Sequence, residues 1–118
     1  MSKAFSFEKR EDSIGILTFD LPNEKVNIFN TKTMQELSDQ LEQLKQMTDI
    51  KCLLFMSKKP GIFIAGADIK EIEQITDENI GYEVARKGQT VFAKFGNLPF
   101  PTIAVIDGAC MGLSLIHI

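Results

Sequence analysis

The chain has 118 residues and a formal net charge of −3, with 44% hydrophobic and 25% charged residues. This length suffices for one folded domain, and the balance of apolar and charged residues is typical of globular rather than disordered proteins. The slight acidity disfavours nucleic-acid binding, which usually needs an excess of Lys and Arg on one face. No apolar run reaches membrane-spanning length, and the charged residues 1–15 do not resemble a secretory signal.

The first predicted elements are a strand, a loop and a helix. Residues 13–19 alternate loosely and end at a turn signal that contains Pro and Asn, which predicts a strand. The polar loop NEKVNIFN follows. Asn30 or Thr31 can cap the next helix, and Thr33 with Glu36 is an alternative capping box. This helix carries one apolar stripe at three- and four-residue steps, formed by Met34, Leu37, Leu41, Leu44 and Met47.

The middle of the chain contains two further predicted strands and the start of a helix. The continuous apolar run at residues 51–57 predicts a strand that is buried on both faces. After a Lys-Pro-Gly turn, residues 62–64 form a short extended segment. Asp68, with Glu71 three residues on, predicts the beginning of a helix.

The last predicted elements are a long helix and a strand. A helix over about residues 77–95 ends at Gly96-Asn97, and the two following prolines prevent it from resuming. Its apolar positions should point inward, namely Ile80, Val84, Val91, Phe92 and Phe95. Residues 102–108 predict another buried strand. The alternation of strands and helices indicates an α/β fold with a largely parallel sheet.

The cysteines and the histidine give no sign of a metal or redox site. Cys52 and Cys110 lie far apart in apolar runs, which favours reduced core cysteines in a cytosol-like compartment. His117 is next to the last residue and has no Asp or Ser partner in a recognisable motif. We expect a frayed terminal residue there rather than a catalytic one.

Two predicted strand ends run into small residues: Ile64 into Ala65-Gly66-Ala67, and Ile106 into residues 107–112. In parallel α/β proteins, ligands bind beyond the carboxyl ends of the strands. Gly66 allows unusual backbone angles, and the flanking alanines leave the amide of Ala67 unshielded. This pattern predicts half of an oxyanion hole, an N–H aimed at a carbonyl oxygen that gains negative charge. A tight turn that merely permits close packing is the alternative.

FIAGADIKEI and FPTIAVIDGACMG resemble the two motifs of the crotonase, or enoyl-CoA hydratase/isomerase, superfamily, in the right order and separated by helices. NEKVNIFN is similar to the family's early coenzyme A-contacting segment. The resemblance covers nearly all of residues 5–112, and it is greatest to the hydratase portion of multifunctional fatty-acid oxidation proteins. It implies the N-terminal part of the crotonase (ClpP/crotonase-like) β-β-α spiral fold, in incomplete form.

The resemblance implies a role for each matching residue. Ala67 would supply the first oxyanion amide, and Gly112 would lie in the second Gly-rich turn, with Leu113 at the position of the second donor. Lys70 would reach the phosphates or ribose of coenzyme A, although a solvated helix lysine is the ordinary interpretation of such a residue. Asp68 is expected to cap its helix rather than act as an acid. The implied coenzyme A-binding set is Lys25, Val26, Asn27, Ala65, Gly66, Asp68, Ile69 and Lys70.

The sequence departs from the family pattern after Gly112. The family continues with further glycines and a catalytic glutamate, whereas this chain continues MGLSLIHI. Ile116 stands at the position of the glutamate, and an isoleucine cannot transfer a proton. Residues 1–112 are therefore interpreted as the N-terminal portion of the family domain. Residues 113–118 are interpreted as a divergent tail from a wrong reading frame or an artificial junction, and the chain as written should be inactive.

The resemblance implies an enoyl-CoA hydratase of fatty-acid β-oxidation, which adds water to trans-2-enoyl-CoA thioesters. Hydration needs no cofactor and no metal, and NAD would be needed only if a dehydrogenase domain follows. Relatives of this family form homotrimers or complexes with a thiolase subunit. A bacterial-type cytoplasmic location is expected, since no mitochondrial transit peptide is seen.

Three alternatives remain open. The first is a non-catalytic fragment that binds coenzyme A thioesters. The second is another crotonase chemistry, such as enoyl-CoA isomerisation or acyl-CoA hydrolysis. The third is an unrelated flavodoxin-like or receiver-like domain, which would need a sheet that closes within the chain.

Overall fold

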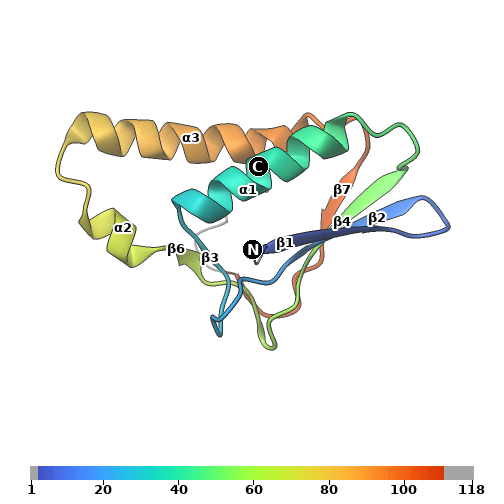
Figure 1. Cartoon of the computed structure of the whole chain (residues 1–118), viewed down its shortest axis with the longest axis horizontal. Helices are drawn as coiled ribbons and strands as arrows, with labels where there is room; N and C mark the ends of the chain where they lie inside the picture. Colours follow the sequence, from blue (N-terminus) through green and yellow to red (C-terminus); the bar gives the residue numbers. More distant parts are fainter. Residues whose placement is uncertain (1–2, 111–118) are drawn as a thin grey trace.

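The computed structural model describes residues 3–110. Its main sheet contains four strands in the order β1-β2-β4-β7 (Figure 1), namely β1 (Phe5–Lys9), β2 (Ile14–Phe19), β4 (Cys52–Ser57) and β7 (Thr102–Ala104). β1 pairs antiparallel with β2, whereas β2, β4 and β7 are parallel to one another. The predicted α/β class with a largely parallel sheet is confirmed.

β1 is an element that the sequence analysis did not predict, although its aromatic and polar residues alternate. Phe5 is buried and its ring stacks on that of Phe19, with 4.4 Å between the centroids. The amides of Ala4 and Phe5 donate to Glu36 Oε2 at 2.7 and 2.9 Å. Glu36 therefore ties the first strand to the first helix. The alternative capping box, in which Thr33 would be the cap and Glu36 its partner, is wrong.

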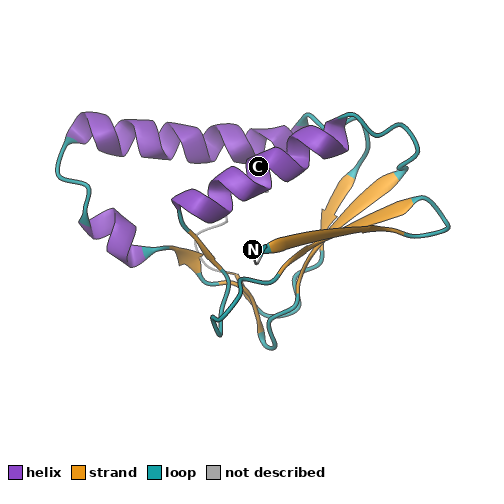
Figure 2. Ribbon diagram, viewed as in Figure 1, coloured by secondary structure: helices purple, strands orange, loops and turns teal. Residues whose placement is uncertain are grey.

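Both long helices, α1 (Thr31–Lys45) and α3 (Glu78–Gly96), lie on the same side of the main sheet (Figure 2). Asn30 caps α1: its side chain accepts from the Thr33 amide at 2.8 Å, and its own amide donates to Thr33 Oγ1 at 2.8 Å. Of the candidate caps, Asn30 is therefore the one that the structure uses. The predicted stripe faces the core, where Leu37, Leu41 and Leu44 are buried.

The inward face of α3 is shorter than predicted. Val91 and Phe95 are buried and Phe92 is partly buried, as predicted. Ile80 and Val84 are 50% and 53% exposed, so that part of the prediction is wrong. Figure 1 shows the reason: the N-terminal half of α3 extends beyond the main sheet and α1.

The main sheet is buried on one face only. In β4, Leu53 and Phe55 are buried, whereas the alternate residues Cys52, Leu54 and Met56 are only half-buried. The prediction of a strand buried on both faces is therefore wrong for the described residues, because the two long helices lie on the same side. β7 is shorter than the predicted residues 102–108, and Ile103 is exposed.

Two pairs of short parallel strands lie outside the main sheet. β3 (Ile28–Phe29) pairs with β6 (Gly66–Ala67), and β5 (Ile62–Ile64) pairs with β8 (Ala109–Cys110). A short helix, α2 (Ile69–Glu73), follows β6 directly. The predicted extended segment at 62–64 and the helix start after Asp68 are thus confirmed, and these short elements carry the candidate site.

Candidate functional site

The pairing of β5 with β8 brings the two small-residue strand ends together. The register places Ile64 opposite Cys110. Gly108 approaches Gly61 so closely that a Cβ added to it would lie 2.5 Å from the Gly61 carbonyl carbon and oxygen. The two strands run in the same direction because they are parallel. The turn at residues 65–67 therefore begins beside Cys110, within the second motif.

The turn itself contains a positive φ angle and an exposed residue. Gly66 has a φ of +123°, a conformation that L side chains rarely adopt. Ala67 is exposed and lies in a two-residue strand, and the following helix begins only at Ile69. The amide of Ala67 is thus outside any regular helix. Its role as an oxyanion donor stays a prediction.

Two backbone hydrogen bonds hold this turn against the loop that precedes α1. The amide of Ala65 donates to the carbonyl of Asn27 at 2.7 Å, and the amide of Asp68 donates to the carbonyl of Phe29 at 2.8 Å. These bonds flank the β3–β6 pair at both ends. The structure therefore brings the two segments expected to bind coenzyme A into direct contact.

α2 extends the turn toward α1. Asp68 Oδ1 accepts from the Lys70 amide at 3.0 Å, so the predicted helix cap is confirmed. Glu71 does not complete a capping box with Asp68. Its Oε1 instead accepts from the amide and hydroxyl of Thr31 at 2.9 and 3.0 Å, which ties α2 to the start of α1. Ile69 and Lys70 are exposed beside the turn.

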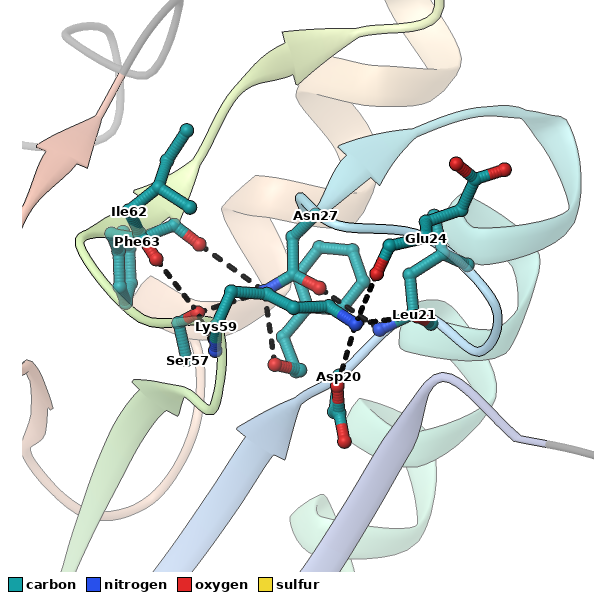
Figure 3. Close-up of polar contacts among 9 residues, drawn as sticks. Asp20, Leu21, Glu24, Asn27, Ser57, Lys59, Ile62 and Phe63 are labelled. Carbon is teal, nitrogen blue, oxygen red and sulfur yellow. Dashed lines mark hydrogen bonds and ion pairs between the residues drawn. The ribbon is translucent and has the colours of Figure 1, made fainter.

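Asn27 lies at the centre of a buried polar network (Figure 3) and is 0% exposed. Its Nδ2 lies 2.9 Å from the Phe19 carbonyl, 2.9 Å from Ser57 Oγ and 3.2 Å from the Phe63 carbonyl. Its Oδ1 accepts from the Leu21 amide at 2.9 Å. The expected place of Asn27 in the coenzyme A-binding wall stays a prediction, and both polar atoms of its side chain are bonded within the protein.

The other two residues of that expected wall are more accessible. Lys25 is exposed and Val26 is half-buried. Lys25 stands two residues before Asn27, whose carbonyl binds the Ala65 amide, and Lys70 stands a few residues after Ala65. The backbone bond between the loops therefore holds two lysine-bearing segments together, and phosphate groups are natural ligands for such lysines.

Lys59 is a feature of the site that sequence reasoning missed. Its ammonium group donates to the carbonyls of Leu21 and Glu24, each at 2.7 Å, and pairs with Asp20 Oδ1 at 2.8 Å. The side chain is only 10% exposed. The carbonyl acceptors lie 38 and 35 residues away in sequence, so no local pattern could have indicated these contacts.

Both cysteines of the chain lie within residues 3–110. Cys52 and Cys110 are free and half-buried, and burial raises the pKa of the Cys110 thiol, which keeps it neutral near pH 7. Residues 3–110 contain no cluster of three or more His, Cys, Asp or Glu that could hold a metal. Over the same range, no helix is both long and apolar enough to cross a bilayer.

Several predicted features cannot be placed. Gly112, Leu113, Ile116 and His117, with the expected tail at 113–118, lie outside the described residues. A pocket in the described part of the chain is lined by residues 8–12, at the end of β1 and in the turn that follows it, and none of the predicted site residues borders it.

Comparison with known proteins bears on this site. The family model described as enoyl-CoA hydratase/isomerase matches residues 9–115. The fatty acid oxidation complex subunit alpha of Vibrio parahaemolyticus is 38% identical over 110 residues, which is 93% of this chain. The protein of the same name from Shewanella halifaxensis is 38% identical over 112 residues, or 95% of the chain. The chain spans 16% of the length of each relative.

Solved structures show the same fold. An enoyl-CoA hydratase from Bacillus anthracis superimposes with a TM-score of 0.77 at 22% identity, over 90% of this chain and 40% of that one. An enoyl-CoA hydratase from Thermoplasma volcanium superimposes with a TM-score of 0.78 at 24% identity, over 91% of this chain and 41% of that one. At such identities the likeness concerns the fold alone, and it confirms the predicted partial crotonase fold.

Proposed function

The chain belongs to the enoyl-CoA hydratase/isomerase family, and on this premise we propose that it carries the coenzyme A-binding and first oxyanion half of an enoyl-CoA hydratase of fatty-acid β-oxidation. One observation carries the proposal. The parallel pairing of β5 with β8 places Ile64, just before the turn at residues 65–67, opposite Cys110 in the second family motif. In the proposed site, the first oxyanion donor comes from the turn at residues 65–67 and the second from the second family motif.

The proposed chemistry of the site is electrostatic. The amide of Ala67 donates to the carbonyl oxygen of the thioester, where negative charge develops as water adds to the neighbouring double bond. One such donor typically contributes about 3–4 kcal/mol of transition-state stabilisation. The positive φ of Gly66 turns the backbone just before this amide, and the bonds from Ala65 and Asp68 to the preceding loop hold it in place without reorganisation.

Hydration also requires groups that move protons, a base for the attacking water and an acid for the α-carbon. The resemblance places the first of these at position 116, where this chain has Ile116. Glu71, the acidic side chain of α2 closest in sequence to the turn, is engaged by Thr31. We therefore propose that the 118-residue chain binds coenzyme A thioesters and does not hydrate them.

Replacing Lys70 by methionine tests the binding proposal. We expect the dissociation constant for coenzyme A, measured by isothermal titration calorimetry, to rise about tenfold, because a charged hydrogen bond to phosphate is lost while the aliphatic stem stays. Lys45→Met, at the exposed C-terminal end of α1, is the matched control and should leave the affinity unchanged. Absence of binding heat with the unchanged chain at millimolar coenzyme A would contradict the proposed function.

A further inference from the structure

We propose that Lys59 is a positioning residue of the candidate site: its ammonium group holds residues 20–24 so that the segment at 25–27 stays aligned with the turn at 65–67. The connection to ligand binding rests on the proposed function. The mechanical connection between the two segments does not, since it depends only on contacts within the chain.

The ammonium group of Lys59 is fully engaged. It has three N–H donors, and three acceptors lie within 2.8 Å: the carbonyls of Leu21 and Glu24 and the carboxylate of Asp20. A nearly buried ammonium group loses its hydrogen bonds to water, so it needs protein acceptors in their place. Two of the three acceptors here are backbone carbonyls of one loop. The side chain thus acts as a tether from the β4–β5 turn to that loop.

Leu21 connects this tether to the site. Its carbonyl accepts from Lys59 Nζ at 2.7 Å, and its amide donates to Asn27 Oδ1 at 2.9 Å. Asn27 in turn accepts the Ala65 amide with its own carbonyl at 2.7 Å. Figure 3 shows Lys59 and Asn27 approaching Leu21 from two different segments. Release of the ammonium group would therefore loosen the loop that positions Ala65.

A second path strengthens the connection on the side of β5. Ser57 Oγ accepts from the Lys59 amide at 3.1 Å and donates to the Ile62 carbonyl at 3.0 Å. The same oxygen lies 2.9 Å from Asn27 Nδ2. The turn that carries Lys59 is thus bonded to the strand that leads into the site. An exposed ion pair would contribute little, but the ammonium group of this lysine is bonded to two backbone carbonyls and its amide to the Ser57 hydroxyl.

The experiment compares Lys59→Met with Lys58→Met, which removes the same charge from the exposed neighbouring position. Hydrogen exchange of the 118-residue chain is followed by NMR at the amides of Leu21 and Ala65, both of which donate to Asn27. In Lys59→Met we expect both amides to exchange at least about tenfold faster, while the β2–β4 amides keep their rates. Coenzyme A affinity should fall about tenfold, and Lys58→Met should change neither quantity.

An unchanged exchange rate at Ala65 in Lys59→Met would overturn the proposal, and so would an equal acceleration across β2 and β4, which would indicate general destabilisation. If Lys59→Met does not fold, Asp20→Asn decides, because it weakens one of the three contacts. Asp20→Asn should raise the exchange rates of the Leu21 and Ala65 amides several-fold, and unchanged rates would overturn the proposal. Failure of the unchanged chain to bind coenzyme A would contradict the proposed function alone.

Discussion

Replacing Asn27 with alanine is expected to lower the free energy of unfolding by about 3–5 kcal/mol, the largest loss that we predict for a single side chain. The substitution leaves the Leu21 amide and the Phe63 carbonyl without their side-chain partner, while the Phe19 carbonyl keeps its bond from the Lys58 amide. It also removes a bond to Ser57. Each buried group left unpaired typically costs about 1–3 kcal/mol.

Urea denaturation followed by circular dichroism measures this loss. The control is Asn23→Gly in the same loop, where the residue is exposed and has a φ of +63°, which glycine adopts easily. We expect the control to stay within about 0.5 kcal/mol of the unchanged chain. A loss below about 1 kcal/mol in Asn27→Ala would show that the network contributes little.

Replacing Gly108 with alanine is expected to separate β5 from β8. The new Cβ would lie 2.5 Å from the carbonyl atoms of Gly61 and 2.7 Å from the Ile62 amide nitrogen. These are backbone atoms, so no rotamer change can relieve the contact, and overpacking of this kind typically costs about 1–3 kcal/mol. Because the pairing places the two motifs side by side, we also expect coenzyme A affinity to fall at least about tenfold.

Gly96→Ala is the matched control for that substitution. A Cβ at Gly96 meets no heavy atom within 4 Å, and the residue ends α3. Alanine should therefore stabilise the chain by about 0.5–1 kcal/mol and leave ligand affinity unchanged. Denaturation and calorimetry are read together: full coenzyme A affinity in Gly108→Ala would contradict the importance of the β5–β8 pairing for the site.

The sequence predicted those parts of the fold whose signals are local. Asp68 was identified as a helix cap, and Asn30 was among the candidate caps of the first helix, because capping is decided within three residues. The exposure of Ile80 and Val84 could not be predicted in this way, since a helical stripe shows which residues are apolar and not what covers them. The partial exposure of one face of the main sheet could not be predicted for the same reason, because the strand sequence does not show what packs on each face.

In the candidate site, too, some features could be predicted from the sequence and others could not. The proximity of the two motifs followed from the rule that parallel strands end at a common edge, and the β5–β8 pair agrees with it. The burial of Asn27, the tether of Lys59 and the bond from Glu71 to Thr31 were all missed. The bonds from Asn27 to Ser57, from Lys59 to Leu21 and from Thr31 to Glu71 join residues 30 or more positions apart, for which a single sequence carries no local signal.

The most direct test of the central claim is an NMR titration of the isotope-labelled chain with crotonyl-CoA. If the turn binds the thioester, the amide resonance of Ala67 should move most, accompanied by those of Ala65 and Lys70, while the amides of residues 8–12 stay in place. Unchanged resonances at all three residues with millimolar crotonyl-CoA would contradict the claim, as would shifts confined to the pocket at residues 8–12.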